Sequence, residues 1–381
     1  MRLKHIARIT AAAAVIALAA AGCNSGTTDS TGSGVDKCQA KIGMFGALTG
    51  DAANLGKVIH NGVQLAVDQY NEDNADCKVT IADYDSQGLP DQAPGLAQKA
   101  INDKNVIGIV GPAFSGESKA AGPAFAEAGL STITPSATNP LLADNGWKTF
   151  HRILGNDNTQ GPAAAKYIKD VLKAPKVFVV DDASEYGKGL ADIVKKDLGS
   201  QVVGTDTVQV KQTDFAATVT KIRASGAPAF FFGGYYAEAG LLRKQLSDAG
   251  GQAITMVAAD GVKDEGFVKA AGQAAAEGTI LTCPCLPASK TAGTFAADYK
   301  KKFGVDAGTY GGEGFDAANV FLAAIKDGKT SRGDVNAFVK AYNADGATKK
   351  IQFDDKGEVA DKVVWAYKVT AGAIVEDQEI K

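Results

Sequence analysis

The sequence contains little histidine, the side chain that enzymes use most often as a general base. Only His5, His60 and His151 occur, and His5 lies among the first ten residues. The chain also lacks the Gly-x-Ser-x-Gly elbow of hydrolases, the His-Glu-x-x-His pair of zinc proteases and the Gly-x-x-x-x-Gly-Lys-Ser/Thr phosphate loop. We therefore expect no enzymatic activity and no cofactor, with an exported hydrolase as the competing class.

Beyond residue 21 no second long apolar run occurs, so no transmembrane helix is expected there. Before it, the N-terminus has the pattern of a cleaved export signal. Arg2, Lys4 and Arg8 supply a basic segment, and the apolar run over 9–21 is too short to span a bilayer. We predict a signal peptide over 1–22.

Cys23 follows Ala-Gly, in the position of the modified cysteine of a bacterial lipobox, although Ala20 stands where leucine is usual. Acylation of Cys23 would hold the protein at the outer face of the cell membrane. The Ser, Thr and Gly residues that follow predict a flexible tether over 23–37. The alternative is an ordinary signal with an incidental cysteine.

Positive charge is also scarce in the mature chain. Removal of the three basic signal residues leaves 37 Lys and Arg against 43 Asp and Glu, a net charge of −6. No cluster of basic residues interrupts this mild acidity. A nucleic-acid partner is therefore not expected.

Four further cysteines form an even set in an exported chain, where disulfides persist. Cys38 precedes an expected strand over 41–45, and Cys77 precedes another over 79–81. If these strands are neighbours, the two thiols share one edge of a sheet. Three pairings are formally possible, and we favour Cys38 with Cys77.

The other two cysteines form the segment Cys283-Pro-Cys285. A metal site would need further ligands, but neither His60 nor His151 stands near them with ligand spacing. A local disulfide is the favoured state, with a metal site as the alternative.

Short apolar strands alternate with amphipathic helical windows along the mature chain, which is the pattern of βα units in parallel sheets. Further strands are expected over 106–110, 176–180, 229–232 and 254–257. Helices are expected over 56–71, 92–102, 159–172, 185–198, 215–224 and 238–249. A second set of units starts near residue 176, which favours two doubly wound parallel-sheet lobes over one large sheet.

In open parallel sheets, ligands bind beyond the carboxyl ends of the strands. After the strand over 106–110, Ser115 opens a helix, whose free amides suit a carboxylate or phosphate. A proline-bounded loop places Ser136 and Thr138 after the next strand. Each pattern could equally be an ordinary helix cap or turn.

The second lobe offers Tyr186, Tyr235 and Asp260, each just after an apolar strand. Tyrosine rings give large contact areas, and Asp260 could pair with a cation. Taken separately, these residues could also be surface tyrosines and a helix-capping aspartate.

Seven motifs together resemble the substrate-binding proteins of branched-chain amino acid ABC transporters, which are type I periplasmic binding proteins. The resemblance covers nearly the whole mature chain. The motifs are ALTG at 47–50, GPAFS at 111–115, ITPSAT at 133–138, NTQGPAAAKY at 158–167, YGKGL at 186–190, GGY at 233–235 and FDDKG at 353–357.

The resemblance implies a site for the charged groups of an α-amino acid. Ser115 would hold the α-carboxylate by hydroxyl and amide, assisted by the amide of Thr138. The Ser136 carbonyl, the Thr138 hydroxyl and Asp260 would bind the α-ammonium, with Asp260 standing where family members typically have glutamate.

The resemblance also implies the rest of the pocket. Tyr186 and Tyr235 would close over the ligand from the second lobe. Leu55, Phe114 and Tyr310 would line the side-chain pocket from the first lobe, with Leu55 replacing an aromatic residue of the enteric members.

The resemblance implies a Venus-flytrap fold with a three-strand hinge. Lobe 1 would comprise 38–156 and 286–356, and lobe 2 would comprise 157–285 and 357–381. The protein would be a monomer that captures leucine, isoleucine or valine between the lobes and delivers it to an ABC permease and its ATPase. The alternative is a sensor of the same fold for another small amino acid, an amide or urea.

Overall fold

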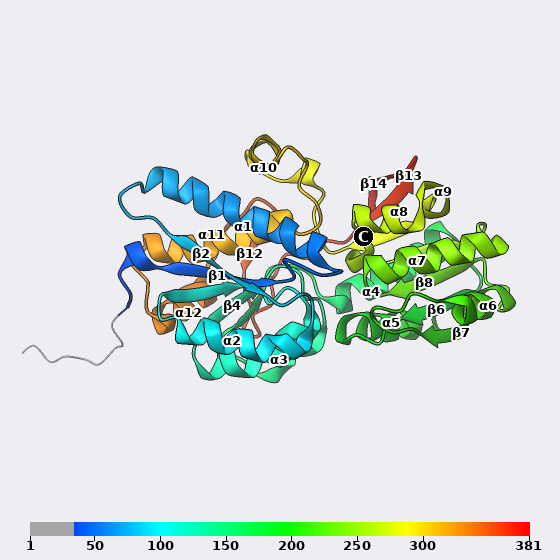
Figure 1. Cartoon of the computed structure of the whole chain (residues 1–381), viewed down its shortest axis with the longest axis horizontal. Coiled ribbons are helices and arrows are strands. Elements are labelled where there is room, and N and C mark those ends of the chain that lie inside the picture. Colours follow the sequence, from blue (N-terminus) through cyan, green and yellow to red (C-terminus); the bar gives the residue numbers. More distant parts are fainter. Residues whose placement is uncertain (1–33) are drawn as a thin grey trace, which may run out of the picture. The chain divides into compact units, whose positions relative to one another are not determined.

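The computed structural model describes residues 34–381, which form two α/β lobes (Figure 1). The predicted signal peptide, Cys23 and most of the predicted tether lie outside the described residues. No helix among the described residues combines the length and the apolar character needed to cross a membrane.

The first lobe contains a parallel sheet with the strand order β2-β1-β3-β4-β5. Helices α1 and α11 pack together over one face, and α2 and α3 lie over the other (Figure 1). The strands are β1 (Lys41–Gly46), β2 (Thr80–Asp85), β3 (Val106–Val110), β4 (Ser131–Thr134) and β5 (Phe150–Arg152). The helices are α1 (Ala53–Asp73), α2 (Ala93–Asn102), α3 (Ser115–Glu127), α10 (Phe295–Phe303), α11 (Gly311–Lys326) and α12 (Arg332–Ala341).

The second lobe contains a mixed sheet with the order β14-β13-β10-β9-β8-β6-β7. Its strands are β6 (Val177–Asp181), β7 (Val202–Thr207), β8 (Ala229–Gly233), β9 (Thr255–Ala258), β10 (Ile280–Cys283), β13 (Trp365–Thr370) and β14 (Ala373–Glu379). Its helices are α4 (Asp157–Lys166), α5 (Glu185–Leu198), α6 (Ala216–Ala224), α7 (Tyr236–Leu246), α8 (Glu265–Ala271) and α9 (Gln273–Ala276). A two-stranded sheet of β11 (Asn343–Asp345) and β12 (Lys350–Gln352) completes the fold.

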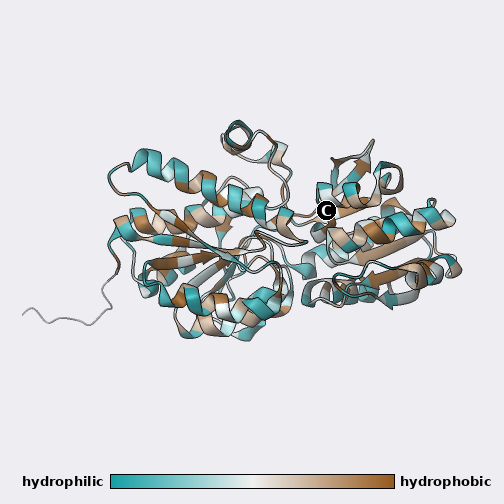
Figure 2. Cartoon of the chain, viewed as in Figure 1, coloured by the Kyte–Doolittle hydropathy of each residue, from teal (hydrophilic) through white to brown (hydrophobic). Residues whose placement is uncertain are grey.

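The central strands are apolar because helices cover both faces of each sheet. Every residue of β3, β6 and β8 is buried, as expected for parallel strands between two helical layers. Figure 2 shows hydrophobic strands within each lobe, while hydrophilic residues gather on the outer faces of helices such as α1 and α7. The core therefore lies between sheet and helices in each lobe.

Two strands at the C-terminus depart from the expected parallel pattern. β13 runs antiparallel to β10, and β14 folds back antiparallel to β13. The turn between β13 and β14 is formed by Ala371 and Gly372, both at positive φ (52° and 81°). Positive φ at both central residues matches the twist of a tight hairpin. Ala-Gly is a weaker turn signal than Asn-Gly, so the sequence did not indicate this hairpin.

Two helices are α-helical over fewer residues than expected and end in a π-helical turn. The window over 159–172 becomes α4, which continues as a π-helical turn over Tyr167–Val171. The window over 238–249 becomes α7, followed by a π-helical turn over Ser247–Gly251. Periodicity alone does not distinguish a π turn from an α turn, because both keep one face buried.

The chain passes between the two sheets three times: after β5, after β10 and after β12. After the second passage, α11 returns to pack on α1 and β3 of the first lobe. The passages lie close to residues 156, 285 and 356.

The four described cysteines form two disulfides. Cys38 is bonded to Cys77, which joins the short 3-10 helix before β1 to the segment before β2. β1 and β2 are neighbours in the sheet, so the two cysteines lie at one edge. Cys283 is bonded to Cys285 at the end of β10, within the second passage between the sheets.

Removal of the Cys38–Cys77 disulfide is expected to destabilise the protein more than removal of Cys283–Cys285. The two bonds close loops of very different length, with sequence separations of 39 and 2. Loop-closure entropy predicts a loss of about 4 kcal/mol for the first and less than about 2 kcal/mol for the second. Urea unfolding of the Cys38→Ser/Cys77→Ser and Cys283→Ser/Cys285→Ser double variants measures both values. Equal losses would contradict the entropic argument.

Candidate ligand-binding site

A cavity with about 300 Å³ of empty space contains eight of the nine predicted ligand-binding residues. Both lobes contribute to its wall. The lining residues are Leu55, Ile59, Ala113, Phe114, Ser115, Ser136, Tyr186, Tyr235, Asp260, Gly261 and Tyr310. Thr138 does not line the cavity, but it is fully buried directly behind Ser136 in the same loop.

The loop after β3 brings Ser115 to the cavity at the first position of α3. Gly111 begins this loop at a φ of 120°, and a Cβ there would lie 2.3 Å from the Phe45 carbonyl oxygen, so only glycine fits. The buried Glu117 carboxylate accepts the Phe114 amide at 3.2 Å and the Ser86 hydroxyl. Burial raises the pKa of Glu117 to about 8. The first amides of α3 remain available to a ligand, because they have no partner within the helix.

A second loop, over 135–140, is held from both sides. The Ser136 hydroxyl donates to the Ala113 carbonyl at 2.6 Å. From below, the Arg152 guanidinium donates to the carbonyls of Ala137 and Asn139, each at 2.8 Å, and pairs with Glu358. Arg152 is fully buried, so this pairing satisfies a charge that water cannot reach. The Thr138 hydroxyl has no hydrogen-bond partner among the described residues.

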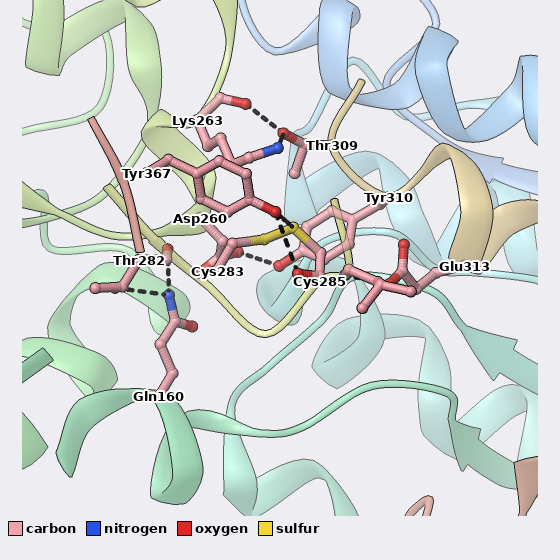
Figure 3. Close-up of a disulfide and its surroundings, with 12 residues drawn as sticks. Gln160, Asp260, Lys263, Thr282, Cys283, Cys285, Thr309, Tyr310, Glu313 and Tyr367 are labelled. Atoms are coloured by element: carbon pink, nitrogen blue, oxygen red, sulfur yellow. Dashed lines mark hydrogen bonds between the residues drawn. A yellow bond between two sulfur atoms is a disulfide. The ribbon is translucent and has the colours of Figure 1, made fainter. Parts of the chain in front are cut away.

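Asp260 is the acidic centre of the cavity. Tyr186 donates to one of its carboxylate oxygens at 2.7 Å. Tyr310 donates to the other at 2.6 Å (Figure 3). Burial raises the pKa of Asp260, and the two phenol donors partly oppose this shift. Tyr186 belongs to the second lobe and Tyr310 to the first, so the Asp260 carboxylate joins the lobes.

Backbone geometry at two positions allows this arrangement. Tyr310 has a positive φ of 69° immediately before α11, which is uncommon for a bulky residue. Gly261 follows Asp260, and a Cβ there would lie 2.9 Å from the Tyr186 ring. Its amide donates to the Tyr186 hydroxyl at 3.1 Å. A side chain at Gly261 would therefore displace Tyr186 from Asp260.

The remaining wall is apolar and aromatic. Phe114 and Tyr235 meet edge to face across the lobes with ring centroids 5.3 Å apart. Tyr235 also packs on Tyr186 at 5.3 Å. Leu55 and Ile59, on α1, complete this side of the cavity.

Two residues that the sequence analysis did not single out lie close to Asp260. Asp157 and Gln160 are fully buried in the first turn of α4. Gln160 donates to the Thr282 carbonyl at 2.9 Å (Figure 3), while its own carbonyl oxygen has no partner among the described residues. An acid in the first turn of a helix is usual, so Asp157 gives no signal of its own in the sequence.

Further contacts hold the lobes together around the cavity. Lys119 on α3 pairs with Glu185 on α5 at 2.9 Å. Asn54 on α1 donates to Asp264, next to α8, at 2.9 Å. The lobes therefore meet in a closed arrangement.

The second passage between the lobes is fixed by buried groups. Glu313 on α11 accepts the Leu286 amide at 3.4 Å and lies 3.6 Å from the Lys349 ammonium. The Tyr367 hydroxyl donates to the Cys285 carbonyl at 3.3 Å, beside the Cys283–Cys285 disulfide (Figure 3). Within residues 34–381, no group of three or more His, Cys, Asp or Glu is arranged to hold a metal ion.

Two lobes that close around a small, mostly apolar cavity define a ligand-binding protein of the flytrap class. The sequence profile of a family described as periplasmic binding protein matches residues 39–373. The chain therefore belongs to this family. Family membership confirms the predicted two-lobed fold and the expectation of a binding protein that catalyses no reaction.

Individual relatives are similar over most of their length. The Leu/Ile/Val-binding protein BraC3 of Rhizobium johnstonii is 33% identical over 344 residues, covering 88% of this chain and 92% of BraC3. The solved leucine binding protein LivK of Thermotoga maritima has a TM-score of 0.82 at 26% identity, covering 90% of this chain and 99% of LivK. LivJ of Streptococcus pneumoniae, solved in complex with isoleucine, has a TM-score of 0.83 at 26% identity, covering 89% and 99%.

Glu358→Gln is expected to lower the free energy of unfolding by about 3–5 kcal/mol, because it leaves the Arg152 charge buried without a countercharge. Asp170→Asn is the control, since it breaks the exposed Lys166–Asp170 pair and should cost less than about 0.5 kcal/mol. Chemical denaturation of both variants gives the comparison. Similar small effects in both would contradict the structural role of the Arg152–Glu358 pair.

Proposed function

We propose that this protein is the extracytoplasmic substrate-binding component of an ABC importer for leucine, isoleucine and valine. The observation that carries the proposal is the placement of a helix start and a buried acid on the wall of one small apolar cavity. A free amino acid is a zwitterion, so a buried site must satisfy both of its charges with hydrogen bonds.

The carboxylate half of this requirement is met on the first lobe. Ser115 offers a hydroxyl and an amide at the positive end of α3, a 13-residue helix. The amide of Thr138 is the second backbone donor that we assign to the carboxylate. Both belong to loops held by buried polar contacts, so the donors are fixed before the ligand arrives.

The ammonium group of the ligand would be bound by Asp260, the Ser136 carbonyl and the Thr138 hydroxyl. Asp260 is 3% exposed, so a cation beside it is shielded from competing water. On ligand binding, the ammonium would share the carboxylate with the Tyr186 and Tyr310 hydroxyls.

The side chain of the ligand is expected to be small and apolar. Leu55, Ile59, Phe114 and Tyr235 present no charged group to the cavity. The cavity is small and its wall is largely apolar, which suits an aliphatic side chain. The relatives named as Leu/Ile/Val-binding, leucine binding and isoleucine-bound proteins agree with this choice.

In this proposal, lobe 1 comprises 38–156 and 286–356, and lobe 2 comprises 157–285 and 357–381. A ligand that contacts Ser115 on lobe 1 and Asp260 on lobe 2 binds the closed form more tightly than the open form. Binding therefore shifts the population toward closure. The closed protein, a monomer tethered through acylated Cys23, then delivers its ligand to the permease and ATPase.

Asp260→Asn is expected to weaken leucine binding at least about 100-fold, because it removes the buried countercharge of the ammonium. Tyr186→Phe should weaken binding only about three- to tenfold, since it removes one neutral hydrogen bond. Isothermal titration calorimetry of the purified variants with leucine measures both. Asp192→Asn, on the exposed face of α5, is the control and should leave the affinity unchanged.

An unchanged leucine affinity in Asp260→Asn would contradict the proposed ammonium site. A thermal-shift screen against the twenty common amino acids, small amides and urea tests the ligand class. The largest rise in melting temperature is expected for leucine, isoleucine or valine, since a ligand far above its dissociation constant stabilises the folded protein. A larger rise with an amide or urea would favour the sensor alternative.

The proposed lipid anchor predicts that Cys23→Ser releases the protein from cells. Acyl chains would hold the protein by burying their methylenes in the membrane, and Cys23→Ser removes the thiol that carries them. Fractionation of cells that produce wild-type and Cys23→Ser protein should find the first in membranes and the second in the medium or periplasm. Equal membrane association would contradict the anchor while leaving the binding function intact.

A further inference from the structure

Asp157 is a buried acid beside the cavity wall, outside the residues that line the cavity. Neither of its carboxylate oxygens makes a hydrogen bond of standard geometry within residues 34–381, although the nearby Thr138 hydroxyl acts to lower its pKa. Its amide donates to the Thr138 carbonyl at 2.9 Å, which places Asp157 directly behind the loop that carries Ser136 and Thr138. A buried carboxylate without a partner is costly, so its position needs a functional or protonation-based explanation.

No cation within residues 34–381 explains Asp157. Arg152, the buried guanidinium of the same region, gives its hydrogen bonds to Glu358 and to the carbonyls of Ala137 and Asn139. No salt bridge joins Asp157 to a described Lys, Arg or His.

Most polar groups around Asp157 are hydrogen-bond acceptors or carry negative charge. The Gln160 carbonyl oxygen is buried without a partner one turn along α4, and the Thr138 hydroxyl is also free among the described residues. The titratable or charged groups that face Asp157 are Asp260 after β9, Tyr186 on α5, Tyr235 before α7, Arg152 on β5 and Glu358 after β12. β10, which also packs on α4, adds only the Thr282 hydroxyl and a disulfide-bonded cysteine. The one cation of this environment, Arg152, gives its N–H groups to Glu358 and to two carbonyls, so it donates no hydrogen bond to Asp157.

In the empty cavity, a bound proton neutralises Asp157 instead of a cation. Burial, followed by the repulsion from Asp260, raises the pKa of Asp157 to about 8. Two buried acids this close titrate as a pair, and the pair keeps one proton near neutral pH. Asp260 accepts hydrogen bonds from two phenols, whereas Asp157 has only the Thr138 hydroxyl near it, so the proton belongs on Asp157.

We propose that Asp157 is a second acid of the ligand site, protonated when the cavity is empty and ionised when an ammonium group is bound, so that capture of the ligand releases one proton to solvent. This inference rests on the proposed amino-acid-binding function and deepens it. Asp157 acts by balancing the ammonium charge together with Asp260, and Gln160 and Thr138 supply neutral acceptors beside them.

General electrostatics gives the expected size of the coupling between leucine binding and proton release. An opposite charge within about 4–6 Å lowers a carboxyl pKa by about 1–3. An acid that is mostly protonated at pH 7 in the empty site therefore becomes mostly ionised in the complex. The leucine association constant should rise about tenfold between pH 6.5 and 8.0, because binding releases a proton over that range.

Calorimetric titration with leucine at pH 7.0, in buffers of low and high ionisation enthalpy, counts the protons released. Wild-type protein should release about 0.5–1 proton per leucine. Asp157→Asn, which mimics the protonated acid, should release fewer than about 0.2 and bind leucine with nearly constant affinity from pH 6.5 to 8.0. Asp182→Asn is the matched control, because Asp182 is another buried acid whose pKa is raised, to about 7, and one of its oxygens accepts the Ser184 hydroxyl while the other is unpartnered in residues 34–381. It should keep the wild-type proton release.

Leucine binding by wild-type protein without proton release or pH dependence would overturn the proposal and leave the proposed function standing. Proton release retained in Asp157→Asn would also overturn it, by assigning the proton to another group. A wild-type protein that binds none of leucine, isoleucine or valine at pH 8.0 would overturn the proposed function and this inference together. Should Asp157→Asn not fold, infrared difference spectroscopy of the wild type decides the question: loss of a protonated carboxyl band on leucine addition supports the proposal, and no loss overturns it.

Discussion

Burial of the Arg152–Glu358 pair is the constraint on which the site depends. Arg152 ends β5 at the first passage between the lobes, and Glu358 follows the third passage. One guanidinium thus joins two hinge segments and also holds the carbonyls of Ala137 and Asn139. Because a buried charge tolerates little displacement from its partners, this pair holds the loop of Ser136 and Thr138 in place. One wall of the candidate site therefore depends on the same contact that joins two hinge segments.

Asp260, unlike Arg152, has hydrogen-bond partners that a ligand would have to share or replace. Its two tyrosine partners come from different lobes, so the closed arrangement already satisfies the carboxylate without a ligand. A ligand that enters must offer the carboxylate more than these two phenols do. An ammonium group can, since a charged donor forms a stronger hydrogen bond than a neutral one. In the proposed function, the cavity would therefore select for charge before the apolar wall of Leu55 and Phe114 distinguishes one aliphatic side chain from another.

The sequence was sufficient for the parallel core and for most of the cavity, for a physical reason. Strands such as β3 and β8 are continuous apolar runs, and the residues after them must emerge at the carboxyl edge of the sheet, where Ser115, Tyr235 and Asp260 lie. The β13–β14 hairpin could not be foreseen, because its strands are partly exposed and its Ala371-Gly372 turn is a weak signal. Asp157 was missed because a helix-start acid looks ordinary until its burial is known.

The second passage between the lobes lies beside a tryptophan, which is an intrinsic fluorophore. The chain contains two tryptophans. Trp365 opens β13 directly opposite the disulfide-bonded Cys283 in the sheet register, and the Lys290 ammonium lies 5.8 Å from its ring centroid. Disulfides and ammonium groups both alter indole emission at short range. Trp147 packs on Phe150 in the first lobe. The hinge therefore carries its own fluorophore, and the first lobe carries a second one that can serve as its reference.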